Sequence, residues 1–270
     1  MDYKKFRNIL IENKAVDSYV SQKIVDFSNN SNYSSSDNVF KLMRYFGEKL
    51  NTYVFQVPIK KLEIGATYFE DSAVKVLILN SNLPKNMMHF TFGHEIYHML
   101  DGAGNRFDDR NGEVILTNSY YEDEIERKAS LFASKLLMPE IEFKKIFNLY
   151  NNKCEKMVEV AIELMYYFEV TYVSVLLRMY ELDLLKDPEI AKKLLEKDEG
   201  DIESYFDTLA LDKEILAPSK IDESYLILRK IQEKGFDLVD EELLSRENLE
   251  IKIKNSEERF LNFVGDADAE

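Results

Sequence analysis

Two histidines stand four residues apart in the segment His94-Glu95-Ile96-Tyr97-His98, which fits the pattern H-E-x-x-H. On an α-helix, residues four apart lie on one face about 6 Å apart along the axis, so both imidazole rings can point at one ion. Two neutral imidazoles can hold a zinc ion, and Glu95 can take a proton from a water bound to it. Only three histidines occur in the chain, and the placement of two of them here favours a metal site over chance.

The residues around this motif predict a helix from about 84 to 100. Asn82 or Ser81 is a candidate N-cap, Pro84 suits the first turn, and Asp101-Gly102 provides a stop. The two histidines then fall in the last two turns of the helix. Its expected apolar stripe, at intervals of three to four residues, consists of Met88, Phe92, Ile96 and Met99.

A second helix, expected from about 120 to 138, offers a third ligand. A catalytic zinc site needs one more protein ligand and leaves a position open to water, and no further histidine or thiol is well placed to supply it. The helix is expected to be capped by Asn118 or Ser119 and to end at Pro139. A carboxylate is therefore expected, and the acidic residues at the start of this helix are Glu122, Asp123, Glu124 and Glu126.

Among these, Glu126 is the favoured ligand. It shares a helical face with small and apolar residues suited to close contact with another helix, where a carboxylate is costly to bury unless a metal compensates its charge. Glu122 is the second choice, and Asp123 and Glu124 are expected on the solvated face. An exposed glutamate favoured by the helix dipole is the alternative for Glu126. The residues that share its face are Ala129, Ser130, Ala133 and Leu137.

The segments before the first helix predict a small sheet. Residues 1–27 read as one or two helices, 28–38 as a loop and 39–50 as a helix. Three strands are expected at 53–57, 62–68 and 73–79, in a partly antiparallel sheet. Such a sheet could bind an extended peptide along an edge strand, or it could serve only to cover the metal helix. A Gly-, Asn- and Asp-rich loop is expected from Gly102 to about Asn118.

Residues 157–185 have a helix-turn-helix outline, with a turn around Glu169-Val170-Thr171. A DNA-reading helix needs several positive contacts, and Arg178 is the one basic residue of this stretch. DNA binding is therefore rejected, and packing or protein recognition is expected. The remaining residues, 187–270, contain 24 acidic and 12 basic residues, so −12 of the net charge of −15 lies there. This region is predicted to be a mostly helical accessory region with an unstructured acidic tail.

Composition indicates a globular protein of the cytoplasm. The chain has 270 residues, of which 45% are hydrophobic, and no stretch approaches the ~20 apolar residues of a membrane span. Its start resembles no secretory signal, so a membrane or secreted location is not expected. Cys154, the single cysteine, fits a reducing compartment and is expected to be structural. The acidic surface argues against nucleic-acid binding and could favour a basic protein partner.

Two segments of the chain resemble the ImmA/IrrE metallopeptidases. Phe90-Thr91-Phe92-Gly93-His94-Glu95-Ile96-Tyr97-His98 matches the F-T-x-x-H-E-x-x-H block of that family. Residues 126–139, with the sequence ERKASLFASKLLMP, are similar to its E-x-x-A-N-x-F-A-x-x-L-L-M-P block. Ser130 replaces the usual Asn, and His89 stands where an Arg is common. His89 is poorly placed to be a third ligand, so a hydrogen-bonding or packing role is expected for it.

The resemblance implies that His94, His98 and Glu126 are metal ligands and that Glu95 is the catalytic base. It also implies a zincin-like fold, and a protein substrate, since members of the family cut helix-turn-helix transcriptional repressors, often of prophages or mobile elements. Zinc is the expected cofactor, with manganese or iron as alternatives because the ligands are nitrogen and oxygen. Tyr97, Tyr120 and Tyr121 are weak candidates for stabilising an oxyanion.

The predicted fold is α+β and mostly helical. A zincin-like metallopeptidase domain is placed at 1–150, a helix-turn-helix-like segment at 151–186 and the acidic accessory region at 187–270. The predicted function is a zinc-dependent endopeptidase that cleaves a helix-turn-helix repressor and so relieves repression in a prophage, mobile-element or stress response. The alternative is a binding module that sequesters a repressor or an antitoxin without cutting it. No direct nucleic-acid or membrane partner is expected.

Overall fold

The fold is described by a computed structural model, which covers residues 1–31, 41–42, 45, 52–70, 75–101, 113–115 and 124–265. It is α+β and mostly helical with one small sheet, as predicted. Its residues divide into two compact units, each assembled from segments far apart in the sequence. The helical unit comprises Met1–Tyr45, Pro84–Arg106 and Thr117–Ala217, and the sheet unit comprises Phe46–Leu83, Phe107–Leu116 and Pro218–Glu270. The division into 1–150, 151–186 and 187–270 follows other boundaries and stays a prediction.

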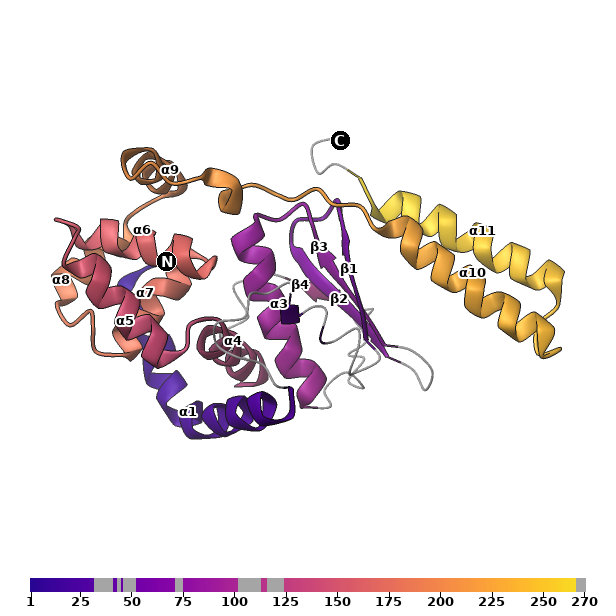
Figure 1. Cartoon of the computed structure of the whole chain (residues 1–270), viewed down its shortest axis with the longest axis horizontal. Helices are drawn as coiled ribbons and strands as arrows, with labels where there is room; N and C mark the ends of the chain where they lie inside the picture. The colour runs from indigo at the N-terminus through magenta and orange to yellow at the C-terminus, as the bar shows by residue number, and fades with distance from the viewer. Residues whose placement is uncertain are drawn as a thin grey trace. The chain divides into compact units, whose positions relative to one another are not determined.

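The helical unit contains both helices on which the predicted ligands lie (Figure 1). The helix around the H-E-x-x-H motif and the helix that ends before Pro139 form where predicted. The helices of this unit are α1 (Tyr3–Ser31), α3 (Lys85–Leu100), α4 (Glu124–Leu137), α5 (Glu140–Asn151), α6 (Met157–Phe168), α7 (Tyr172–Glu181), α8 (Pro188–Leu195), α9 (Glu199–Thr208) and the 3₁₀ helix η3 (Lys213–Leu216).

Helix α1 is one continuous helix, and it holds α4 in place. It runs to Ser31, so the prediction that the loop begins at Ser28 was wrong. Lys135 of α4 lies 2.6 Å from the carboxylate of Asp17. The rings of Phe27 and Phe132 meet edge to face, with centroids 6.1 Å apart. These contacts fix the helix that carries Glu126.

The start of α3 differs from the prediction. Pro84 occupies the N-cap position, and no side chain caps the helix. Ser81 and Asn82, the predicted caps, are used elsewhere: the Ser81 hydroxyl donates to the carbonyl of Ile221, and the Asn82 amide donates to the carbonyl of Ile59. Both side chains therefore form hydrogen bonds inside the sheet unit, with partners that lie far away in the sequence.

Helices α6 and α7 have the predicted helix-turn-helix outline, with a bend of 108° between them. Glu169 ends α6 in the left-handed conformation at φ 51°, and the Thr171 hydroxyl caps α7 by accepting from the amide of Ser174. No single helix in the described part of the chain is long and apolar enough to cross a membrane. The bent α6–α7 pair passes that test only when both helices are taken together, and only by length and composition.

Arg178, the basic residue of this segment, is buried inside the helical unit. Its Nε donates to the carbonyl of Met138 at 3.0 Å, and its Nη1 donates to Glu181 at 3.2 Å. Glu181 also accepts a hydrogen bond from the amide of Asn13 at 2.8 Å. The cation thus joins α7 to the end of α4 and is not presented to a nucleic acid, which supports the packing role predicted for the segment.

The sheet unit is built on a mixed four-stranded sheet in the order β1-β3-β2-β4. β1 and β3 are parallel, while β2 is antiparallel to β3 and to β4, so the predicted partly antiparallel sheet is confirmed. The fourth strand was missed, because it lies in the segment predicted to be a loop. The strands are β1 (Thr52–Val57), β2 (Ile64–Glu70), β3 (Lys75–Asn80) and β4 (Glu113–Ile115).

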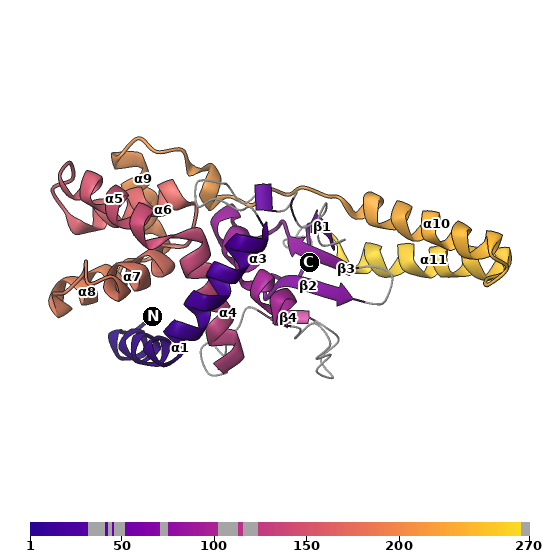
Figure 2. The same cartoon turned by 60° about the horizontal axis from the view of Figure 1, so that its bottom comes forward.

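Two long helices complete the sheet unit, α10 (Ser224–Asp240) and α11 (Arg246–Phe263). They run side by side as a hairpin, which Figures 1 and 2 show from two directions. Ile227 of α10 is buried against Phe55 and Val57 of β1. The accessory region is therefore helical in its described residues, as predicted, while residues 266–270 of the predicted tail lie outside them.

The outer edge of β1 is partly occupied by the chain itself. The backbone N–H of Gln56 donates to the Glu223 carboxylate at 2.8 Å, and the N–H of Glu223 donates to the carbonyl of Gln56 at 2.9 Å. A peptide cannot pair with Gln56 while these bonds are made, because they use both of its backbone groups.

Candidate metal centre

Close packing of α3 on α4 brings the predicted ligands together. A Cβ atom added to Gly93 would lie 3.2 Å from the Cβ of Ala133 and 3.3 Å from the Cδ1 of Leu137. Glycine therefore lets the two helices approach at the turn that carries His94. Ala133 and Leu137 belong to the small apolar face on which Glu126 was placed, and this face does contact another helix, as predicted.

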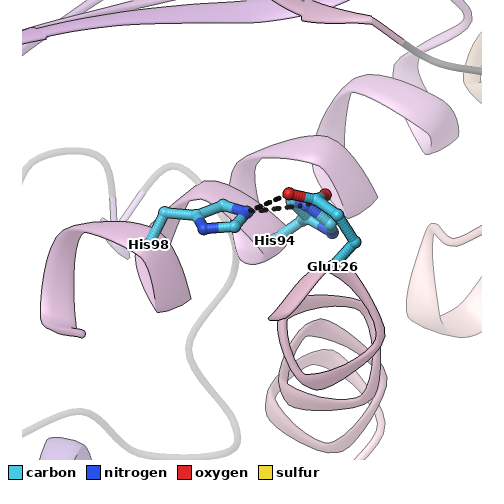
Figure 3. A group of neighbouring side chains, drawn as sticks. All are labelled: His94, His98 and Glu126. Atoms are coloured by element: carbon cyan, nitrogen blue, oxygen red, sulfur yellow. Dashed lines mark hydrogen bonds and ion pairs between the residues drawn. The ribbon is translucent and has the colours of Figure 1, made fainter. Parts of the chain in front are cut away.

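His94, His98 and Glu126 converge on one point (Figure 3). The Nε2 atoms of the two histidines are 3.1 Å apart. Oε2 of Glu126 lies 3.0 Å from His94 Nε2, and Oε1 lies 3.4 Å from His98 Nε2. Among the described residues, these three form the group of histidine, cysteine and acidic side chains that could hold a metal ion.

The spacing of these atoms fits a metal ion. In a tetrahedral zinc site with bonds of about 2.0–2.1 Å, neighbouring ligand atoms lie about 3.3 Å apart. The three separations, 3.0, 3.1 and 3.4 Å, are close to that value. Two imidazoles and one carboxylate form a donor set of nitrogen and oxygen that suits zinc, and also manganese or iron. The residues present therefore fit the expected cofactor.

Ser130 orients the first histidine. Its Oγ lies 3.2 Å from Nδ1 of His94, and both side chains are buried. When Nε2 binds a metal, Nδ1 carries the ring proton and donates it to a neighbouring acceptor. In the sequence, Ser130 was identified as a departure from the family pattern and as one of the residues that share a helical face with Glu126. Its position four residues after Glu126, on the same face, was the available signal for a role beside the ligands.

Glu126 and His98 shift each other's pKa even without a metal ion. Burial raises the pKa of Glu126, but hydrogen bonds from His94 and His98 outweigh burial and hold that pKa far below its ordinary value. Burial lowers the pKa of His98, but the hydrogen bond to Glu126 and the charge of Glu95 outweigh it, and the pKa is raised. A negative carboxylate thus faces the two rings.

Glu95 is buried beside this group, with 1% of its surface exposed. Its Oε1 has no hydrogen-bond partner among the described residues. Burial raises the pKa of Glu95, while the charges of His98 and His94 oppose the rise. A buried carboxylate oxygen without a partner is costly, and such an atom is expected where a side chain acts on a bound molecule.

The other candidates lie apart from the group or outside the described residues. His89 is buried, and its Nδ1 lies 3.3 Å from the Glu169 carboxylate, so it lies apart from the ligands in keeping with the hydrogen-bonding or packing role predicted for it. Glu124 pairs with Lys128 at 2.6 Å and is solvated, as predicted. The weak oxyanion candidate Tyr97 is buried, and burial, the charge of Asp101 and a hydrogen bond to Tyr19 raise its pKa, so its hydroxyl is engaged away from the ligands. The candidates outside the described residues are Tyr120, Tyr121, Glu122 and Asp123.

Asp101 does more than end α3. It accepts a hydrogen bond from the Tyr19 hydroxyl at 2.9 Å and pairs with Lys23 at 3.1 Å. Burial raises the pKa of Asp101, but these two partners outweigh burial and lower it. Lys128 of α4 lies over the Tyr19 ring, 4.9 Å from its centroid. The end of the histidine helix is thereby tied to α1 and α4, through contacts that the sequence did not reveal.

Residues 47–180 match the model of a known protein family, peptidase family M78, described as the IrrE N-terminal-like domain. The match includes both segments that carry the ligand group and Glu95. No curated protein and no solved structure matches the chain.

Proposed function

Because the chain belongs, through residues 47–180, to the ImmA/IrrE family of metallopeptidases, we propose that it is a zinc-dependent endopeptidase. The observation that carries the proposal is the convergence of His94, His98 and Glu126 beside a buried carboxylate, Glu95. His94, His98 and Glu126 would bind the ion, and Glu95 would be the catalytic base.

Each side chain has a defined task in this proposal. A bound zinc ion would lower the pKa of a water molecule and polarise the scissile carbonyl. Glu95 would accept the proton of that water and later deliver it to the leaving amine. The raised pKa of Glu95 suits this exchange, because a base that must also act as an acid works best when its pKa is near the working pH. Ser130 would hold the ring of His94 in the tautomer that leaves Nε2 free to bind.

The proposed substrate is a helix-turn-helix transcriptional repressor, cleaved in the cytoplasm so that repression is relieved. Resemblance to the family is the main support for this choice. Charge gives a second reason, because DNA-binding proteins expose basic surfaces and this chain has a net charge of −15. The single cysteine is consistent with a reducing compartment.

The test is incubation of the zinc-loaded chain with the repressor encoded beside its gene. We expect a cleavage product that disappears with a chelator, returns when zinc is restored, and is absent for Glu95→Gln. The Glu95→Gln variant keeps its metal ligands, so it should still bind zinc and the repressor. A repressor that is bound but left intact by the zinc-loaded wild type would favour the binding module and refute the peptidase.

A further inference from the structure

A small polar cavity lies beside Ser130, where helices α1, α3, α4 and α7 of the helical unit meet. Its volume is about 20 Å³, counted as the space open to the centre of a water molecule. A buried water needs at least about 10–15 Å³ on that measure. The cavity therefore has room for one water molecule and is too small for an organic ligand. Its polar lining consists of Asn13, Ser130, Ser134, Ser174 and Glu181.

Ser134 brings to this cavity a hydroxyl that has no hydrogen-bond partner among the described residues. The residue is 7% exposed, so bulk solvent does not freely pair with that hydroxyl. A buried hydroxyl without a partner is costly, and an ordered water is the usual partner where the protein supplies none. Because Ser134 lines the cavity, a water inside it can reach the Ser134 hydroxyl.

Ser130 has a hydroxyl proton that its contact with His94 does not use once zinc is bound. A serine hydroxyl carries one proton to donate and two positions that accept. In the proposed zinc-bound state, Nδ1 of His94 donates to the Ser130 Oγ, which lies 3.2 Å away, so the proton of Ser130 needs a separate acceptor. The described residues provide no other hydrogen bond for Ser130. The cavity beside Ser130 is where such an acceptor can lie.

The spacing of the two serines suits a water that bridges them. Ser130 and Ser134 are four residues apart on α4, so their side chains leave one face of the helix about 5–6 Å apart. Two hydrogen bonds of about 2.8 Å span that distance. A water between the two serines can accept the proton of Ser130 and form a second bond with the Ser134 hydroxyl.

The opposite wall of the cavity provides further partners. Glu181 of α7 lines the cavity, and its Oε1 accepts from the side-chain amide of Asn13 at 2.8 Å. A carboxylate has about four acceptor positions, so Glu181 can accept from a water as well. Buried waters typically make about three hydrogen bonds. The two serines and this wall together offer that number.

We propose that the cavity binds one ordered water molecule, which accepts the hydroxyl proton of Ser130 and so helps to hold the ring of His94 for metal binding. The role of the water rests on the proposed zinc site, whereas its presence needs no metal. The water lies behind Ser130 as seen from the ring and is held by Ser134 and the far wall. It therefore does not take the place of the Ser130 hydroxyl when that hydroxyl is removed.

A crystal structure of the full chain, at a resolution that shows ordered water, tests whether the water is present. We expect one water within hydrogen-bonding distance of Oγ of both Ser130 and Ser134, in metal-free and in zinc-loaded crystals. A cavity without a water, or a water that does not bridge the two serines, overturns the proposal. Because the metal-free crystal already gives this answer, failure of the water can be told from failure of the peptidase, which would leave the repressor intact.

Two substitutions of one residue test the role of the water. Ser134→Ala removes one partner of the water but leaves room for it, so Ser130 keeps its acceptor and the zinc affinity should equal that of the wild type. Ser134→Val fills the cavity with methyl groups and displaces the water. Its zinc affinity should fall about three- to tenfold, less than the loss expected when a direct partner of a ligating histidine is removed.

Competition with a chromophoric zinc chelator measures the affinity of both variants, and urea unfolding of the metal-free chains shows that each is folded. A Ser134→Val chain that binds zinc as tightly as Ser134→Ala overturns the positioning role of the water. So does a Ser134→Val crystal in which the water is lost while the affinity stays that of the wild type.

Discussion

Replacing Ser130 by alanine should weaken zinc binding without removing any ligand. The Ser130 hydroxyl lies 3.2 Å from Nδ1 of His94, which is only 2% exposed, so water cannot easily replace the lost partner. Loss of a hydrogen-bond partner of a ligating histidine typically costs about 10- to 100-fold in metal affinity. That range corresponds to about 1.4–2.7 kcal/mol. Loss of this buried hydrogen bond should also lower the unfolding free energy of the metal-free chain by about 1 kcal/mol.

Ser134→Ala is the matched control for this experiment. Ser134 lies one turn further along α4 and is 7% exposed, as is Ser130. Its hydroxyl has no hydrogen-bond partner among the described residues, so its loss should leave the metal affinity unchanged. Competition with a chromophoric zinc chelator measures the affinity of both variants, and urea unfolding measures their stability. If Ser130→Ala binds zinc as tightly as wild type, or if Ser134→Ala weakens binding equally, the orienting role of Ser130 is refuted.

Three further changes test the surroundings of the site. Glu126→Gln should lower zinc affinity at least about 100-fold, since it removes the charge of a proposed ligand. Glu124→Gln, on the solvated face, should leave the affinity unchanged. Equal losses in the two variants would disprove the assignment of Glu126 as a ligand. Arg178→Met should lower the unfolding free energy by about 3 kcal/mol in urea, because the Glu181 carboxylate loses its buried cation; a loss below about 1 kcal/mol would contradict this. Asp101→Asn should cost about 1 kcal/mol at pH 7. Because the fold lowers the pKa of Asp101, its carboxylate stabilises the fold fully when the pH is above the ordinary pKa of 3.8, and this stabilisation is lost as the pH falls through the pKa of the folded state. The difference in stability between Asp101→Asn and the wild type should therefore vanish in acid. A difference that does not depend on pH would exclude an ionic origin.

Residue spacing predicted that His94, His98 and Glu126 lie together, because the determinants of this arrangement are local. Four-residue separation put His94 and His98 on one helical face before any packing was known. The small face around Ala133 predicted close helix contact, and Gly93 is the residue on α3 that meets it. The position of Glu126 could therefore be predicted from the residue spacing in two helices, together with the energetic cost of burying a carboxylate without a compensating charge.

What the sequence did not predict depends on partners far apart in the chain. The expected cap Asn82 instead donates its side-chain amide to Ile59 and Gly265, more than 180 residues away in the second case. Strand β4 has a local signal in Val114 and Ile115, but it lies inside a stretch whose composition favours a loop, and pairing with β2 decides the outcome. Long-range pairing of this kind overrides local propensity.

The most direct test of the metal centre is a crystal structure of the zinc-loaded chain with anomalous data at the zinc edge. We expect one ion bound by Nε2 of His94, Nε2 of His98 and a carboxylate oxygen of Glu126, with bonds of about 2.0–2.2 Å. An ion bound elsewhere, a Glu126 side chain turned to solvent, or imidazole rings that point apart would contradict the proposed site.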